Sequence, residues 1–83
     1  MPIVFRWNGY RFFFFSNEGN PLEPCHIHVA KGDSYAKIWL EPQVMADQVY
    51  GFDAPQIHKI IAKVEQERKI IKEEWNEYFN KSN

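Results

Sequence analysis

Two alternating segments, Ile3–Trp7 and Tyr10–Ser16, flank the pair Asn8-Gly9 and are rich in β-branched and aromatic residues. Asn-Gly between two such segments predicts a β-hairpin with a type I′ turn, because both central residues of that turn need a positive φ. A two-residue loop fixes the register, with Trp7 opposite Tyr10, Arg6 opposite Arg11, Val4 opposite Phe13 and Ile3 opposite Phe14. The predicted core face then carries Ile3, Phe5, Trp7, Tyr10, Phe12 and Phe14, and the other face carries Val4, Arg6, Arg11, Phe13 and Phe15.

A polar loop over residues 16–24 separates this hairpin from a second one, formed by Cys25–Lys31 and Ser34–Leu40. Glycine at the first position of the turn Gly32-Asp33 suits type II′. This turn sets His28 opposite Lys37. The apolar residues then share one face, Cys25, Ile27, Val29, Ala36, Ile38 and Leu40, whereas the other face carries His26, His28, Ala30, Tyr35, Lys37 and Trp39.

The remainder of the chain changes to a helical pattern after a segment, Val44–Tyr50, that suits a short strand or an irregular crossing. Asp53 is a good N-cap, and Gln56 completes a capping box. The apolar stripe of the helical part has 4-3-4-3 spacing and consists of Ile57, Ile61, Val64, Ile71, Trp75 and Tyr78. One helix over 54–79 would be about 39 Å long, which overhangs a domain of this size. We therefore expect a break near Glu67–Lys69, the alternative being a straight helix whose end packs on a partner.

These elements make the expected fold α+β in a single domain, 1–83, with a β-rich part at 2–50 and a helical part at 53–80. The antiparallel sheet consists of two hairpins, with one further short strand as an option, and is followed by one long or two shorter C-terminal helices.

The amino-acid composition excludes several classes of protein. One cysteine in 83 residues excludes an intramolecular disulfide scaffold, a net charge of −1 excludes a globally basic nucleic-acid binder, and no apolar run reaches the ~20 residues of a membrane span. A cytoplasmic location is expected.

The first candidate for chemistry is the pair Arg6 and Arg11, because like charges directly opposite each other destabilise a sheet. Three interpretations are open. Glu18 or Glu23 neutralises the two arginines, or both arginines extend into water, or the two arginines form an anion site. Two guanidinium groups side by side suit a phosphate, which each can hold in a bidentate manner.

His26 and His28 are the second candidate, since residues i and i+2 of a strand point to the same face. They are structural histidines, a His-x-His metal pair, or acid–base groups that contact phosphate. A zinc ion needs three or four ligands, and Cys25, Glu18, Glu23 and His58 are the groups available to complete them. Cys25 points to the opposite face of a regular strand, so we expect no metal and no other cofactor.

Tyr35 and Trp39 share the face of the histidines, and Phe13 and Phe15 join them if both hairpins form one sheet. Such aromatic side chains either lie under a covering layer, formed by the C-terminal helix or a second subunit, or form a stacking platform. Aromatic residues interleaved with Arg, Lys and His on a sheet are what proteins that bind single-stranded nucleic acid use.

Several motifs together resemble the bacterial domain-of-unknown-function family numbered 4160. They include Asn8-Gly9-Tyr10-Arg11-Phe12-Phe13, Pro24-Cys25-His26-Ile27-His28-Val29, Ala36-Lys37-Ile38-Trp39-Leu40 and Trp75-Asn76-Glu77-Tyr78-Phe79. A second proline is common in that family where this chain has Cys25. The resemblance implies a small bacterial protein without established activity, often encoded beside another small domain family (numbered 2442) in a suggested toxin–antitoxin pair. It supplies no catalytic residues.

The resemblance therefore implies a toxin–antitoxin-like module, and the residues predict that it contacts RNA or another phosphate-bearing ligand through Arg6, Arg11, Tyr35 and Trp39. If it is an enzyme, it is a metal-independent ribonuclease with His28 as base, His26 as acid, and Lys37 and the arginines stabilising the phosphate charge. The alternatives are a non-enzymatic interaction or dimerisation module and a His-x-His metal protein. The expected partners are a second copy of the chain, a small protein encoded nearby, and RNA, with no membrane.

Overall fold

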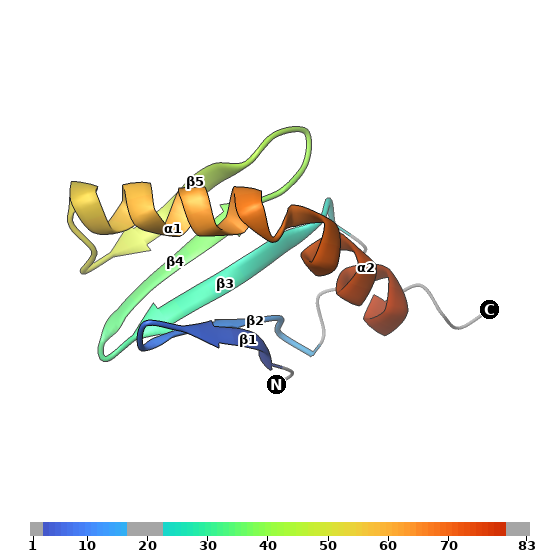
Figure 1. Ribbon diagram of the computed structural model, residues 1–83, viewed down its shortest axis with the longest axis horizontal. Coiled ribbons are helices and arrows are strands. Elements are labelled where there is room, and N and C mark those ends of the chain that lie inside the picture. The colour runs from blue at the N-terminus through green and yellow to red at the C-terminus, as the bar shows by residue number, and fades with distance from the viewer. Residues whose placement is uncertain (1–2, 17–22, 80–83) are drawn as a thin grey trace.

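The computed structural model describes residues 3–16 and 23–79. Within these ranges five strands form one antiparallel sheet, and two helices follow (Figure 1). The elements are β1 (Ile3–Trp7), β2 (Tyr10–Phe13), β3 (His26–Lys31), β4 (Ser34–Trp39), β5 (Met45–Tyr50), α1 (Ala54–Gln66) and α2 (Arg68–Phe79). Each strand pairs with the next one in the sequence, in the order β1-β2-β3-β4-β5. The predicted α+β fold is confirmed, and the uncertain segment before residue 51 is a fifth strand.

Both predicted hairpins are present in the described residues. Asn8 and Gly9 have φ of 51° and 83°, as a type I′ turn requires, and Gly32 has φ of 59°. The second hairpin has the predicted register throughout, including His28 opposite Lys37. The two hairpins join through β2 and β3, where Phe12 faces Val29 and Phe13 faces His28.

The first hairpin differs from the prediction at its open end. Trp7 lies opposite Tyr10 and Arg6 opposite Arg11, as expected, but Ile3 lies opposite Phe13 rather than Phe14. Val4 is a bulge, and one extra residue on one strand reverses which face the following side chains occupy. Val4 therefore packs against the core, whereas Ile3 is 45% exposed, so their predicted faces were wrong.

The helices begin and break where the sequence indicates. The Asp53 carboxylate accepts from the Gln56 backbone N–H at 2.9 Å, and the Gln56 side chain accepts from the Asp53 N–H at 3.0 Å. α1 ends at Gln66, and Arg68, which opens α2, donates from Nη2 to the Leu40 carbonyl at 3.3 Å. The predicted stripe needs correction at two positions, because Ile60 is fully buried and Tyr78 is 41% exposed.

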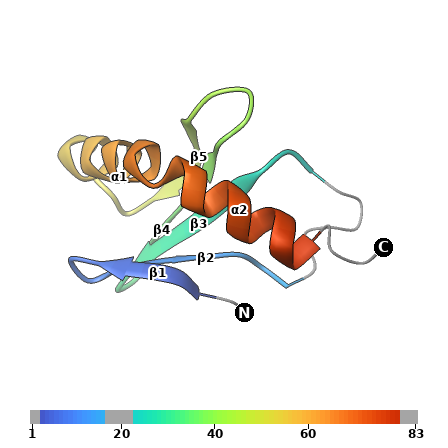
Figure 2. The same cartoon turned by 45° about the vertical axis from the view of Figure 1, so that its right-hand side comes forward.

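One face of the sheet carries both helices (Figures 1 and 2). α1 runs along the side of β4 and β5, and α2 turns across the end of the sheet where β2 ends and β3 begins. Trp75 of α2 is buried there, with its ring 5.3 Å from that of Phe14. The bend thus folds the second half of the helical segment back onto its own sheet. The core is one cluster, made of residues 10, 12, 14, 25, 27, 29, 36, 38, 40, 52, 60, 64, 71 and 75.

Neither helix in the described part of the chain has the length and hydropathy needed to cross a membrane.

Candidate functional site

The face of the sheet opposite the core, called here the outer face, carries one row of residues that crosses all five strands. The strand pairings set Arg6 opposite Arg11, Arg11 opposite Ala30, Ala30 opposite Tyr35, and Tyr35 opposite Tyr50. We call these five residues the cross-strand row. Neighbouring strands are about 4.8 Å apart, so the row spans about 19 Å from Arg6 to Tyr50. It has two guanidinium groups at one end, a small alanine in the middle and two phenol rings at the other end.

Tyr50 is the member of this row that the sequence did not reveal. Strict alternation sets Asp47 and Tyr50, three residues apart, on opposite faces. The pairing of β4 with β5 shifts between Tyr35 and Lys37, and Gln48 at this point has φ of 54°. This bulge brings both Asp47 and Tyr50 onto the outer face. Tyr50 is 64% exposed, and its ring lies 6.3 Å from that of Tyr35 at an interplanar angle of 24°.

The arginines of the row have no carboxylate partner in the part of the chain that the structure describes. Arg6 is exposed and Arg11 is half-buried, and neither forms an ion pair with a residue of 3–16 or 23–79. Glu23, one of the two expected neutralising groups, is instead paired with Lys37, with 3.3 Å between Oε1 and Nζ. Glu18, the other, lies outside the described residues. Two adjacent positive charges therefore face outward together.

The histidines form a different environment on the same face, two residues or about 7 Å further along the strands. We call Phe15, His26, His28, Lys37 and Trp39 the histidine cluster. His26 and His28 are 1% and 2% exposed, with ring centroids 5.1 Å apart. Phe15 covers His28, with ring centroids 3.8 Å apart.

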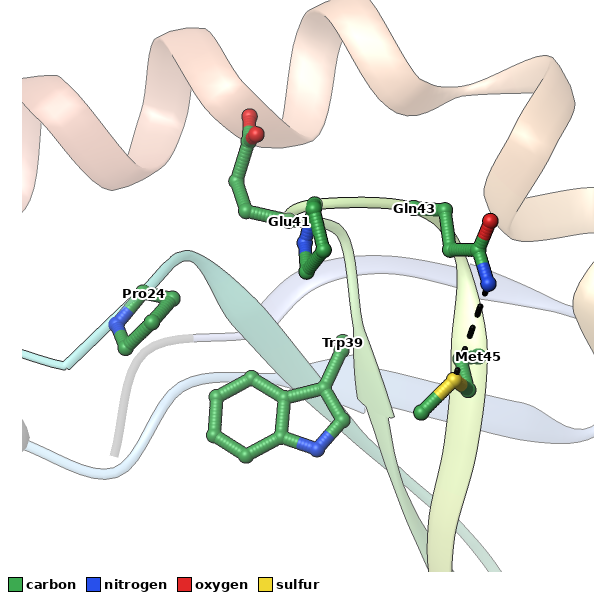
Figure 3. Close-up of a pocket in the computed structure, with 6 residues that line it drawn as sticks. Pro24, Trp39, Glu41, Gln43 and Met45 are labelled. Atoms are coloured by element: carbon green, nitrogen blue, oxygen red, sulfur yellow. Dashed lines mark hydrogen bonds between the residues drawn. The ribbon is translucent and has the colours of Figure 1, made fainter.

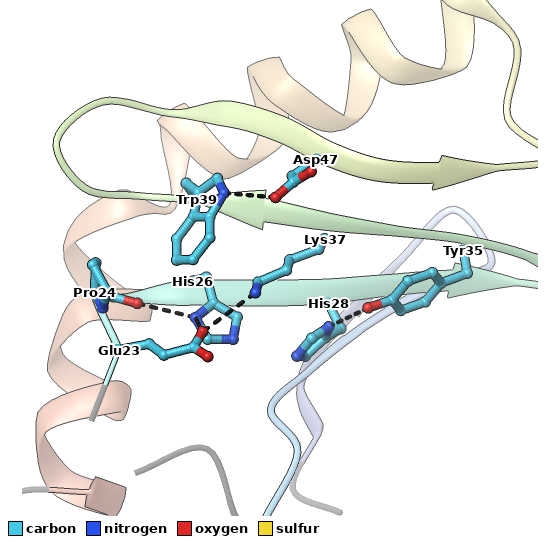
Figure 4. Close-up of polar contacts among 8 residues, drawn as sticks. All are labelled: Glu23, Pro24, His26, His28, Tyr35, Lys37, Trp39 and Asp47. Carbon is cyan, nitrogen blue, oxygen red and sulfur yellow. Dashed lines mark hydrogen bonds and ion pairs between the residues drawn. The ribbon is translucent and has the colours of Figure 1, made fainter. Parts of the chain in front are cut away.

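Each histidine of the cluster has a hydrogen-bond partner at Nδ1 (Figure 4). His26 Nδ1 lies 3.0 Å from the Pro24 carbonyl oxygen, so this nitrogen carries the proton and donates it. His28 Nδ1 lies 2.7 Å from the Tyr35 hydroxyl oxygen. The second bond links the cluster to the cross-strand row, since Tyr35 belongs to the row. Buried imidazoles with fixed partners and stacked rings hold neighbouring strands in place.

Lys37 and Trp39 are also engaged within the protein. The Lys37 ammonium lies 4.2 Å from the centre of the Trp39 ring and is paired with Glu23, and the side chain is 14% exposed. The Trp39 indole N–H donates to the Asp47 carboxylate at 3.1 Å. Of the predicted contact residues, the structure thus groups Arg6, Arg11 and Tyr35 in the row, and Trp39 with Lys37 and the histidines in the cluster.

The described residues offer no obvious metal site. No group of three His, Cys, Asp or Glu side chains comes together within 3–16 and 23–79. Cys25 belongs to the buried core, and its backbone carbonyl accepts from the Leu40 N–H at 2.9 Å. It therefore lies on the face opposite the histidines, as the register predicts.

A pocket of about 250 Å³ lies beside Trp39, at the end of the histidine cluster (Figure 3). Its walls are Pro24, Trp39, Glu41, Pro42, Gln43 and Met45. The carboxylate of Glu41 points away from Trp39 and pairs with Lys72 of α2. This hydrogen bond to the Lys72 ammonium lowers the pKa of the Glu41 carboxyl from its usual 4.5. The pocket is mainly apolar and lies away from the two arginines.

Comparison with known proteins identifies a family. No curated protein and no solved structure matches the chain. Residues 9–76 match the family described as a domain of unknown function, DUF4160. This range covers most of the chain and includes Arg11, His26, His28, Tyr35 and Tyr50. The chain belongs to the DUF4160 family.

Proposed function

We propose that this protein binds single-stranded RNA through the cross-strand row, with Arg6 and Arg11 on the phosphate backbone and Tyr35 and Tyr50 under the bases. The observation that carries the proposal is the pair of outward-facing arginines, which have no ion pair among the described residues and share a row with two stacked tyrosines. Like charges opposite each other destabilise a sheet, and a bound phosphate removes that cost.

The chemistry of the row matches the two parts of a nucleotide. A guanidinium group presents parallel N–H donors that fit phosphate oxygens, and an aromatic ring on a sheet stacks on any base. Ala30, a buried residue whose side chain is one methyl group, lies between the two kinds of contact. With a net charge of −1 for the whole protein, the attraction is local to this row rather than general.

The histidine cluster has a supporting role in this proposal. Burial to 1–2% leaves the histidine rings little surface for a substrate, and the Tyr35 hydroxyl next to His28 helps to hold a base-stacking ring in place. A ribonuclease reaction with His28 as base, His26 as acid and Lys37 as a charge-stabilising group stays a prediction, as does a toxin–antitoxin-like role. Loss of RNA cleavage in His28→Gln, with RNA binding retained, would support catalysis.

Binding of a labelled uridine octamer, measured by fluorescence anisotropy between 50 and 200 mM salt, tests the proposal. Each phosphate contact on a single strand contributes a slope of about −0.7 to the plot of log K against log salt. The double variant Arg6→Gln/Arg11→Gln is expected to bind more weakly and to lose about 0.7 of slope if both groups hold one phosphate, or about 1.4 if each holds its own.

The matched control is Lys69→Gln/Lys72→Gln, which removes two charges from α2 and leaves the outer face intact. Its affinity and slope should equal those of the wild type. Unchanged affinity and slope in the arginine variant would reject the proposal.

Self-association is the second candidate function. It is favoured by the exposed apolar side chains of β5, since Met45, Val49 and Tyr50 are 48%, 40% and 64% exposed on an edge strand. Sedimentation equilibrium at micromolar concentrations tests it. A dimer that Tyr50→Asp separates into monomers would support this candidate, and a monomer at all concentrations would reject it.

A further inference from the structure

A second hollow lies around the edge of the sheet from the cross-strand row, between the β1–β2 turn and α1. Its volume is about 350 Å³, and its walls are Trp7, Asn8, Lys59, Ala62, Lys63 and Gln66. It therefore combines an indole ring, two carboxamides and two ammonium groups. None of the described residues that line it is Asp or Glu.

The two lysines of this hollow differ in what holds them. Lys63 is paired with Glu67, with 3.0 Å between Nζ and Oε2, and its ammonium lies 5.4 Å from the centre of the Trp7 ring. Lys59 lies one helical turn before Lys63 and is exposed. It forms no ion pair within residues 3–16 and 23–79. Lys59 is therefore the charge in this hollow that is available to an anion.

The hollow lies next to the arginine end of the cross-strand row. A smaller hollow of about 240 Å³ at the hairpin turn is lined by Arg6, Trp7, Asn8, Gly9, Tyr10 and Arg11. The two hollows share Trp7 and Asn8. The side chain of Lys31, the last residue of β3, reaches this turn, with its ammonium 4.5 Å from the centre of the Tyr10 ring. A chain of positive charge thus leads from Arg11 and Arg6 around the turn to Lys59.

We infer that the hollow beside Trp7 is a second nucleotide subsite, which binds the next part of the RNA strand after it leaves the arginines. The Lys59 ammonium contacts a phosphate, the Trp7 indole supplies apolar surface for a base, and the carboxamides of Asn8 and Gln66 bond to the edge of that base. A carboxamide both donates and accepts, which is the pattern that base edges require. This inference rests on the proposed function and extends it from one face of the sheet to the adjoining helix.

Binding of uridine tetramers and octamers tests the subsite, because the row alone accommodates only a short strand. We expect the wild type to bind the octamer with a salt slope steeper than that of the tetramer. In Lys59→Gln the octamer slope should fall by about 0.7, the value for one phosphate contact on a single strand, while the tetramer slope stays the same. Lys69→Gln is the control, because Lys69 is an 89% exposed lysine on the other helix.

A second variant changes the hollow without touching a lysine. Ala62→Glu sets a carboxylate in its wall on an exposed helical position. It is expected to reduce octamer affinity about fivefold or more, because the carboxylate repels the phosphate and hinders the base from reaching Trp7. Ala54→Glu, the same change at the other end of α1, should leave octamer affinity unchanged.

The two proposals fail in different ways. If the tetramer binds through Arg6 and Arg11 but Lys59→Gln and Ala62→Glu leave octamer binding unchanged, the subsite is rejected and the row stands. If neither oligonucleotide binds the wild type, the proposed function is rejected together with the subsite. Adenosine 5′-monophosphate tests the source of the nucleotide. If amide NMR shifts of Asn8 and Ala62 show that the monophosphate binds as tightly as the octamer, the hollow is a free-nucleotide site and the RNA path is overturned.

Discussion

The outer face of this sheet contains two neighbouring regions with similar residue types and opposite environments. In the cross-strand row, Arg6 and Tyr50 are exposed and the arginines have no ion pair among the described residues. In the histidine cluster, His26 and His28 are almost fully buried and bonded within the protein. About two residues along each strand separate them.

This difference shows that a polar residue on the open face of a sheet is not by itself a candidate for function. A buried polar group needs internal partners, and those partners use up the chemistry that a ligand would otherwise meet. We therefore assign the cluster to stability and propose the row for binding. Tyr35 belongs to both, because its ring lies in the row and its hydroxyl contacts His28.

The largest expected effect is on stability, from His28→Ala. This change removes a ring that stacks on Phe15 and bonds to Tyr35, and we expect a loss of about 3 kcal/mol in the free energy of unfolding, as for other large buried side chains. Urea denaturation measures it. Arg6→Ala, from the row, should change stability by less than about 0.5 kcal/mol. Equal effects of the two changes would remove the distinction between the regions.

The next effect is on binding, from Tyr50→Ala. Loss of one stacked base is expected to weaken RNA binding by about 1–3 kcal/mol, while the free energy of unfolding stays within about 0.5 kcal/mol of the wild type because the side chain is exposed. Anisotropy and urea denaturation of the same variant give both values. Tyr78→Ala, an exposed tyrosine of α2, is the control and should bind RNA normally.

Tyr35→Phe separates the two roles of the residue that the regions share. It keeps the ring and removes the hydroxyl next to His28 Nδ1, so we expect a loss of about 1 kcal/mol in stability and no loss in RNA affinity. Tyr50→Phe makes the same chemical change at an exposed position and should alter neither. Weakened binding in Tyr35→Phe would mean that the hydroxyl itself contacts the RNA.

The smallest effect concerns pH and lies beyond both regions, at the pair Glu41 and Lys72. The pKa of Glu41 is lower in the folded protein than its usual 4.5, so the pair stabilises the fold above that pH, and this contribution disappears as the pH falls through the folded value. Lys72→Gln should therefore melt slightly below the wild type at pH 7, and this difference in melting temperature should be smaller at pH 2.5. The melting temperature of Lys69→Gln should equal the wild-type value at both. If the difference in melting temperature between Lys72→Gln and the wild type widened in acid, it would contradict the lowered pKa assigned to Glu41.

Much of the fold could be predicted because local signals agreed with one another. Asn8-Gly9 fixed one turn and Gly32 the other, and the Asp53–Gln56 capping box marked the start of α1. The bulges at Val4 and Gln48 could not be predicted. Each adds one residue to a strand without a composition signal, and each reverses the faces that alternation assigns.

The candidate site was predicted only in part, because the turns could be recognised in the sequence and the bulges could not. Arg6 and Arg11 followed from the turn, so their pairing was correct, whereas Tyr50 reached the outer face only through the bulge at Gln48. The burial of the histidines depends on Phe15 and Trp75, which contact them from outside the strand. Strand periodicity identifies the face of a side chain but carries no information about what covers it.

The most direct test of the account is a map of backbone amide NMR shifts on titration with a uridine tetramer. We predict that the largest changes occur at Arg6, Arg11, Ala30, Tyr35 and Tyr50, across all five strands, and that residues 68–79 of α2 do not change. Shifts confined to α2, or none at millimolar tetramer, would contradict the claim that the cross-strand row binds RNA.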